Sequence, residues 1–161
     1  MNERFVLITG ASRGLGKILS WRFAREGYGL CLVAQEEKRL NELSIELKQQ
    51  FKNEIQFISC DLGNSMDIDV LINKTRQKLP RLDVLINNAA IQGAIGPLWE
   101  NDLDSWKKVI NVNLIGPIAL CRAFVPWMEA NAGGSIINLS GGGATGPRPN
   151  FSAYASSKAA L

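Results

Sequence analysis

The chain has 161 residues, which is the size of one domain and enough to bury a hydrophobic core. Hydrophobic residues make up 46% and charged residues 20% of the chain, which excludes collagen-like, disordered and coiled-coil proteins. The formal net charge is only +3 and is not concentrated in one region, so we expect no nucleic-acid partner.

Short apolar runs alternate along the chain with longer amphipathic ones. Residues 5–8 form the kind of continuous apolar run that lies buried on both faces in a parallel sheet. The alternation then predicts helices over 15–26, about 40–51, 66–79 and 103–130, and further strands over 29–34, 55–60, 83–86 and 135–139. Pro117 and Pro126 are expected to kink or interrupt the long helix. A glycine-rich loop (140–150) leads to a last helix that begins near Ser152.

This order of elements predicts the α/β class, with a doubly wound, Rossmann-like parallel sheet in a single domain over 1–161. Because the last helix has barely begun at Leu161, we expect the domain to be C-terminally incomplete and to need a further strand and helix. The apolar stretch 112–128 is broken by polar residues and prolines, so we expect no membrane span and a cytoplasmic protein. The three cysteines are expected to be buried thiols.

A glycine-rich segment, TGASRGLG (residues 9–16), joins the first predicted strand to the first helix. Gly10 permits a tight turn there, while Gly14 and Gly16 let backbone approach a pyrophosphate. Unpaired N–H groups at the helix N-terminus would then meet the phosphates. The alternative is a plain strand-to-helix turn that happens to use glycine.

The last helix carries Tyr154 and Lys158, which at a spacing of i and i+4 share one helix face. A positive charge beside a phenol favours its tyrosinate form, so such a tyrosine can exchange a proton with a carbonyl or an alcohol. The sequence contains no histidine, which excludes a histidine base and a Ser-His-Asp triad and leaves tyrosine the best candidate. No metal site is expected. The alternative makes Tyr154 a surface aromatic and Lys158 a solvated charge.

The segment TGASRGLG resembles the TGxxxGxG motif of the classical short-chain dehydrogenase/reductase family. Further motifs of that family follow in order: Asp61-Leu62, Asn87-Asn88-Ala89-Ala90, Asn113 and Tyr154-Ala155-Ser156-Ser157-Lys158. Each of these motifs is weak alone, but five in the right order on the right elements are a strong signal. The resemblance covers essentially all 161 residues and corresponds to the front part of a usual family member.

The resemblance implies an NAD(P)-dependent oxidoreductase that interconverts a small-molecule carbonyl and an alcohol by hydride transfer. Tyr154 would be the acid/base, Lys158 would activate it and bind the nicotinamide ribose, and Asn113 would hold a water of the proton relay. Asp61 would contact the adenine, with a turn residue or helix cap as the alternative. The cofactor-binding residues it implies are Gly10, Ser12, Arg13, Gly14, Leu15, Gly16, Asp61, Leu62, Asn87, Ala89, Tyr154 and Lys158. For Asn113 the alternative is an exposed polar residue at a helix irregularity such as a π-bulge.

Two positions depart from the family pattern. Ala90 replaces the glycine of the usual NNAG motif. The family's catalytic serine falls on Gly141 here, one residue after Ser140, so either Ser140 reaches the site or the serine hydroxyl is missing. We predict Ser140 as the catalytic serine.

Charged residues near the predicted second strand indicate which dinucleotide the protein prefers. The predicted second strand ends in Val33-Ala34-Gln35, with no carboxylate to bind the ribose hydroxyls of NAD. Arg13 in the glycine loop is able to pair with a 2′-phosphate, although Glu36 and Glu37 lie nearby. We therefore expect NADP(H), with NAD(H) as the alternative.

Two further questions stay open from the sequence. The chain is either an enzyme or a dinucleotide-binding fragment or remnant without turnover. A flavodoxin-like or nucleotide-sugar protein of related topology would leave Tyr154 and Lys158 unexplained. We also expect a homodimer or homotetramer that associates through the long helix, unless its apolar side chains form an ordinary buried stripe. These side chains are Leu114, Ile118, Cys121, Val125 and Met128.

Overall fold

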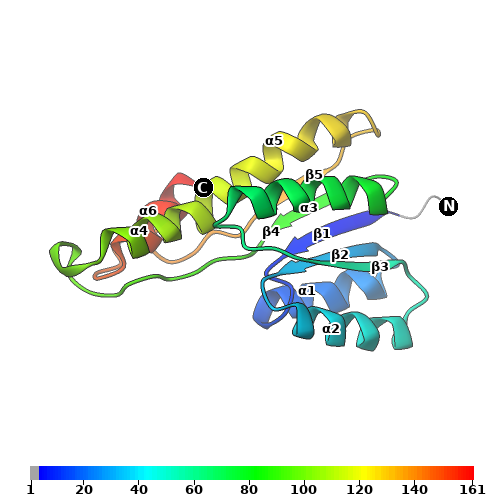
Figure 1. The fold of residues 1–161 in the computed structure, drawn as a ribbon, viewed down its shortest axis with the longest axis horizontal. Helices are drawn as coiled ribbons and strands as arrows, with labels where there is room; N and C mark the ends of the chain where they lie inside the picture. Colours follow the sequence, from blue (N-terminus) through cyan, green and yellow to red (C-terminus); the bar gives the residue numbers. More distant parts are fainter. Residues whose placement is uncertain (1–3) are drawn as a thin grey trace.

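The computed structural model describes residues 4–161, and its centre is a five-stranded sheet with the order β3-β2-β1-β4-β5 (Figure 1). All four neighbouring pairs of strands are parallel. The predicted doubly wound α/β fold is therefore confirmed. The strands are β1 (Phe5–Thr9), β2 (Gly29–Ala34), β3 (Ile55–Ser59), β4 (Val84–Asn87) and β5 (Ser135–Asn138).

The strand order reverses beside β1. The chain passes from β1 outward to β2 and β3, and then returns to place β4 on the other side of β1. In open parallel sheets, ligands bind at the carboxyl ends of the strands next to such a reversal. The topology thus directs attention to the loops that follow β1 and β4.

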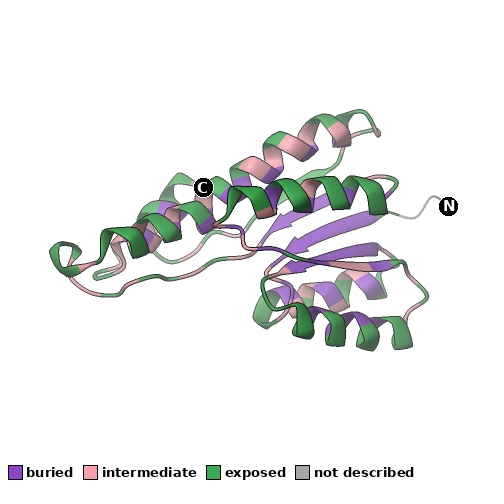
Figure 2. Cartoon of the chain, viewed as in Figure 1, coloured by how far each residue is buried: buried purple, intermediate pink, exposed green. Residues whose placement is uncertain are grey.

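Helices cover both faces of the sheet, as Figure 1 shows. Successive residues of a strand point to opposite faces, so the buried run of β1 contributes Val6 and Ile8 to one core and Leu7 to the other. The first core is closed by α1 (Gly14–Arg25) and α2 (Glu37–Gln50), and the second by α3 (Ser65–Lys78) and α5 (Gly116–Glu129). In Figure 2 the inner strands are buried and the outer helix faces exposed.

The predicted interruption of the long helix is confirmed before Pro117, whereas α5 continues past Pro126. The structure divides the long helix into α4 (Leu103–Ile110), a π-helix η2 (Asn111–Ile115) and α5, with Pro117 in the first turn of α5. A proline at that point removes an N–H that an uninterrupted α-helix would use, which matches the local change in hydrogen bonding. A short 3₁₀ turn, η1 (Leu98–Glu100), precedes α4.

By length and composition, the helical run Leu103–Glu129 is apolar enough to cross a membrane. Core helices of soluble proteins pass the same test. In the structure, this run places Val112, Leu120 and Phe124 in the core against the sheet. Its packing is therefore that of a core helix.

The association stripe predicted on the long helix is partly wrong. Met128 is buried in the core and cannot belong to a surface. Ile118 is exposed, while Leu114, Cys121 and Val125 are half-buried and line a shallow apolar groove beside β5. The helical period explains the division, because residues 120, 124 and 128 face the sheet.

The last helix, α6 (Ser152–Ala160), packs against α4 and the π-helix. The indole N–H of Trp106 in α4 donates to Ser152 Oγ at 3.2 Å. The neighbouring strand β5 is exposed along its whole length, including Ile136 and Ile137. The helix that carries Tyr154 is thus positioned by the interrupted long helix.

Two of the three cysteines are buried, as predicted. Cys31 is fully buried and Cys60 is 3% exposed, and burial raises the pKa of each thiol to about 12. Cys121 is half-buried, and burial also raises its pKa. All three are free thiols.

This difference predicts the order in which the thiols react. The thiolate is the nucleophile, so with iodoacetamide at pH 8 we expect Cys121 to be alkylated at least about tenfold faster than Cys31 and Cys60. Peptide mass spectrometry over time measures the three rates. In urea all three should react alike, and equal rates in the native protein would contradict the prediction.

Candidate active site

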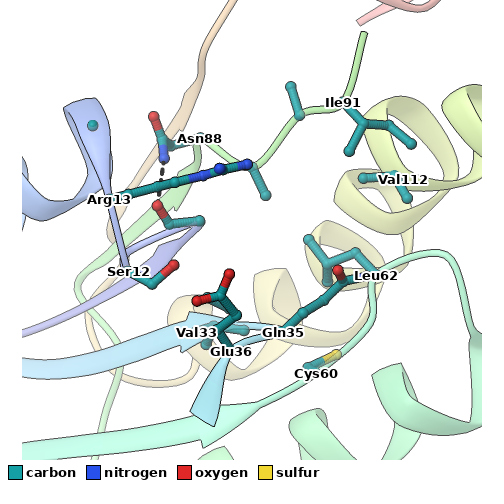
Figure 3. A pocket seen from close by; sticks show the side chains of 15 residues that line it. Ser12, Arg13, Val33, Gln35, Glu36, Cys60, Leu62, Asn88, Ile91 and Val112 are labelled. Carbon is teal, nitrogen blue, oxygen red and sulfur yellow. Dashed lines mark hydrogen bonds between the residues drawn. The ribbon is translucent and has the colours of Figure 1, made fainter. Parts of the chain in front are cut away.

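A cleft opens at the carboxyl ends of the strands, where the order of the sheet reverses (Figure 3). Its walls come from the loops after β1, β2, β3 and β4 and from the π-helix. The lining residues are Gly10, Ser12, Arg13, Gly14, Val33, Ala34, Gln35, Glu36, Cys60, Leu62, Asn88, Ala89, Ala90, Ile91 and Val112.

The glycine loop forms one wall of the cleft, and its glycines have different roles. Gly10 has a φ of +65°, and a Cβ there would lie 2.9 Å from the Cα of Ala89. A Cβ on Gly16 would overlap the carbonyl oxygen of Gly10. Gly14 also has a positive φ, +55°, but has open space around it. Gly10 and Gly16 therefore allow close packing, and Gly14 serves the turn.

The N-terminus of α1 borders the cleft at Gly14. No side chain caps this helix, and its first turn has no acidic residue. Uncapped N–H groups and the positive end of the helix dipole together suit a phosphate. The residues present thus fit the pyrophosphate of a dinucleotide.

Hydrogen bonds tie the loop after β4 to the glycine loop. Thr9 Oγ1 accepts from the backbone N–H groups of Asn88 and Ala89, each at 3.0 Å. The side-chain amide of Asn88 donates to the carbonyl of Thr9 at 2.8 Å. It also donates to the carbonyl of Gly10 at 3.3 Å (Figure 3). Both walls of the cleft are therefore held in one arrangement.

Six of the residues predicted to bind the cofactor line this cleft: Gly10, Ser12, Arg13, Gly14, Leu62 and Ala89. Leu15 lies on the exposed side of α1. Gly16 packs against the backbone of Gly10. The carboxylate of Asp61 accepts from the N–H of Gly63 at 2.8 Å, as a turn residue does. The contact of Asp61 with an adenine ring stays a prediction.

Asn87 does not line the cleft. It is buried at the end of β4, where its amide donates to Asn138 Oδ1 at 2.8 Å and its own Oδ1 has no partner among residues 4–161. Adjacent strand residues point in opposite directions, and this alternation turns Asn88 toward the glycine loop. Asn88, Ile91 and Val112 also line the cleft but were not predicted as site residues, although Asn88 stands in the quoted NNAA motif.

Charge at the end of β2 bears on the choice of dinucleotide. Gln35 and Glu36 line the cleft opposite Arg13. Glu36 forms an ion pair with Arg39 at 2.5 Å, so part of its negative charge is compensated. Arg13 is exposed, and no carboxylate among the described residues pairs with it.

Lys158 lies buried beside Tyr154. Only 4% of Lys158 is exposed, and its Nζ donates to the carbonyl of Leu139 at 2.6 Å. Nζ lies 6.0 Å from the centroid of the Tyr154 ring. Burial lowers the pKa of Lys158. The reading of Lys158 as a solvated surface charge is therefore wrong, and its ammonium faces a half-buried phenol.

Asn113 holds α6 against the cleft. It is fully buried in the π-helix, so the reading of an exposed residue is wrong, although the irregularity itself is confirmed. Its side chain accepts from the N–H of Ile91 and donates to the carbonyl of Ile91, both at 2.9 Å, and donates to Ser157 Oγ at 3.1 Å. Ser157 in turn donates to the carbonyl of Tyr154 at 2.7 Å. This chain of bonds links the cleft wall to Tyr154.

Gly141 occupies the position next to the Tyr154 hydroxyl. A Cβ built on Gly141 would overlap that hydroxyl oxygen. Ser140 is exposed, and none of the hydrogen bonds found in residues 4–161 involves its side chain. A catalytic role for Ser140 stays a prediction.

Among residues 4–161, no three His, Cys, Asp or Glu side chains lie close enough together to hold a metal ion.

Comparison with known proteins connects this arrangement to one family. A family model described as short chain dehydrogenase matches residues 4–161. The chain is 32% identical over 160 residues to a 3beta-hydroxysteroid dehydrogenase of Mediterraneibacter gnavus. That match covers 99% of this chain and 57% of the relative, so the chain spans little more than half of the relative's length.

Solved structures resemble the fold closely. A metagenomic short-chain oxidoreductase in complex with NADP superposes with a TM-score of 0.93 at 33% identity, covering 98% of this chain and 71% of the other. L-sorbose reductase from Gluconobacter frateurii, solved with NADPH and L-sorbose, has a TM-score of 0.94 at 29% identity and is covered to 61%, against 100% of this chain.

Proposed function

The chain belongs to the short chain dehydrogenase family, and from this premise we propose that the protein is an oxidoreductase that interconverts a carbonyl and an alcohol. One observation carries the proposal: Tyr154 is joined through Ser157 and Asn113 to the wall of a cleft whose glycine loop suits a dinucleotide, and the buried Lys158 lies on the same helix. A nicotinamide dinucleotide, when bound, supplies or accepts the hydride.

The residues of this chain would supply binding and proton transfer. The N–H groups at the start of α1 bind the pyrophosphate, and Gly10 and Gly14 let it approach the backbone. The phenol of Tyr154 donates its proton to the carbonyl oxygen, and in the reverse direction the tyrosinate accepts one from the alcohol. The ammonium of Lys158 stabilises the tyrosinate that remains. Asn113 would position the helix and a water of the proton relay.

We propose NADP(H) as the cofactor, with NAD(H) as the alternative. Several similar structures were solved with NADP or NADPH, and Arg13 is the basic side chain of the cleft. The pairing of Glu36 with Arg39 weakens the repulsion that a 2′-phosphate would meet.

The Arg13→Gln variant tests this choice. We expect the Kd for NADPH to rise about tenfold or more, because a charge-assisted bond to phosphate is lost, and the Kd for NADH to change less than about twofold. Fluorescence titration of both dinucleotides measures the two values. An equal effect on NADPH and NADH would assign Arg13 to the shared pyrophosphate instead.

The second candidate function is dinucleotide binding without turnover. The glycine at position 141 favours it, since no hydroxyl is available there to polarise a carbonyl. The full chain, incubated with NADPH and a panel of ketones and aldehydes, separates the two. Oxidation of NADPH with formation of the matching alcohol supports the enzyme, and binding of NADPH without product supports the binding module.

We further propose a cytoplasmic protein that acts as one dinucleotide-binding domain over 1–161 and assembles as a homodimer or homotetramer. The exposed Ile118 and the half-buried Leu114, Cys121 and Val125 would contribute to that association. Sedimentation velocity of the full chain tests the assembly, and a monomer at micromolar concentration would exclude the homodimer and the homotetramer.

A further inference from the structure

Arg148 lies over the ring of the proposed proton donor. Its guanidinium carbon is 4.7 Å from the centroid of the Tyr154 ring and 4.0 Å from that of Phe151. One N–H of its guanidinium donates to the carbonyl of Gly142 at 3.4 Å. The two rings and the carbonyl thus hold a half-buried cation over the ring that bears the reacting hydroxyl.

The charge of Arg148 is not compensated by the protein. None of the ion pairs found in residues 4–161 includes it. A guanidinium carries five N–H donors, and only one of them has a partner here. The other donors are left for a ligand that brings an acceptor, and a carboxylate matches their fork geometry best.

The glycines of the loop leave room for such a ligand. Gly141 places no side chain against the Tyr154 hydroxyl, and a Cβ on Gly142 would already lie 3.3 Å from the guanidinium of Arg148. Side chains at these two positions would therefore crowd the phenol and the cation. Residues 141 and 142 therefore place no side chain on either polar group.

We propose that Arg148 binds the carboxylate of the substrate, and that the substrates are short oxo acids. This inference rests on the proposed oxidoreductase function. Because the guanidinium lies within 5 Å of the Tyr154 ring, a carboxylate bound there is only a few bonds from the carbonyl that receives the proton. The geometry therefore suits 2-oxo and 3-oxo acids.

A matched substrate pair tests the assignment with the full chain and NADPH. Phenylglyoxylate carries the carboxylate next to its ketone, and its methyl ester lacks the charge. We expect the wild type to have the higher kcat/KM for the acid. Arg148→Gln should lower that value about 30-fold or more and lower the value for the ester at most about threefold. Arg148→Lys should retain an intermediate preference for the acid over the ester. Arg25→Gln removes the same charge at an exposed position of α1 and should change neither kcat/KM value.

Two kinetic results would overturn the proposal. Equal use of acid and ester by the wild type would mean that no anion site exists. Equal losses for both substrates in Arg148→Gln would mean that Arg148 only supports the loop around Tyr154, as a lowered unfolding temperature of that variant would also indicate.

A binding measurement keeps this inference separate from the proposed function. Benzoate is inert to hydride transfer and carries the same carboxylate, so calorimetry with NADP⁺ present reports on the anion site without turnover. If no carbonyl is reduced but benzoate binds the wild type and Arg25→Gln and not Arg148→Gln, the oxidoreductase function fails and the anion site stands. If benzoate fails to bind the wild type, or binds Arg148→Gln equally, the role of Arg148 is refuted whatever the activity.

Discussion

Replacing Tyr154 with phenylalanine is expected to lower kcat of the full chain about a thousandfold. The substitution removes only the hydroxyl, which is the proposed proton donor, and general acid–base groups of this kind contribute about 10² to 10⁴ in rate. The ring remains for Arg148 to stack on. The affinity for NADPH should therefore change less than about threefold. Steady-state oxidation of NADPH and a separate binding titration measure the two quantities.

The chain offers a matched control, because it contains only two tyrosines. Tyr28 packs edge-on against Phe23 with ring centroids 5.0 Å apart, and Arg4 lies over its ring at 4.4 Å. Tyr28→Phe makes the same chemical change outside the cleft and should leave kcat unaltered. Activity above about a tenth of the wild type in Tyr154→Phe would show that another group donates the proton.

Replacing Gly16 with alanine is expected to lower the stability of the protein and its affinity for NADPH more than replacing Gly14 with alanine. The new Cβ overlaps the carbonyl oxygen of Gly10, a backbone atom, and lies 2.7 Å from the amide of Asn88. Relief requires the loop and the start of α1 to separate. We expect the free energy of unfolding to fall by about 3 kcal/mol and the Kd for NADPH to rise about a hundredfold.

Gly14→Ala is the comparison that isolates the overlap. Gly14 shares the positive φ of a turn position but has no atom within 4 Å of a built Cβ, so its substitution costs only about 1–2 kcal/mol of backbone strain. Urea denaturation and NADPH titration of both variants measure the difference. Equal losses would mean that backbone strain, and not the contact with Gly10, decides the behaviour of the loop.

Local patterns made much of the fold predictable. The buried run of β1 and the alternation that follows it led to the parallel sheet, because burial on both faces requires continuous apolar side chains. The end of β1 and the start of α1 also followed from local signals. The predicted fourth strand began at Asp83, one residue before Val84, and the carboxylate of Asp83 accepts from the N–H of Phe5 at 2.8 Å.

Contacts between distant segments decide the positions of residues that local patterns do not place. One alternative made Asn113 an exposed residue, yet it is buried. It forms hydrogen bonds with Ile91 and Ser157, which lie 22 and 44 residues away in the sequence. Asn88 and Asn87 stand side by side in one motif. Only the pleat of β4 and the position of the glycine loop decide which of them faces the cleft.

The sequence by itself determined the class of fold, the glycine loop and the Tyr154–Lys158 pair, since each depends on spacing within one strand, turn or helix. Only the tertiary structure decided what surrounds Tyr154: the buried ammonium of Lys158, the bare Gly141 and the stacked Arg148. Arg148 stands in a loop without periodicity, so nothing in its local sequence indicates the ring on which it lies. The folding of that loop back onto α6 brings the two together.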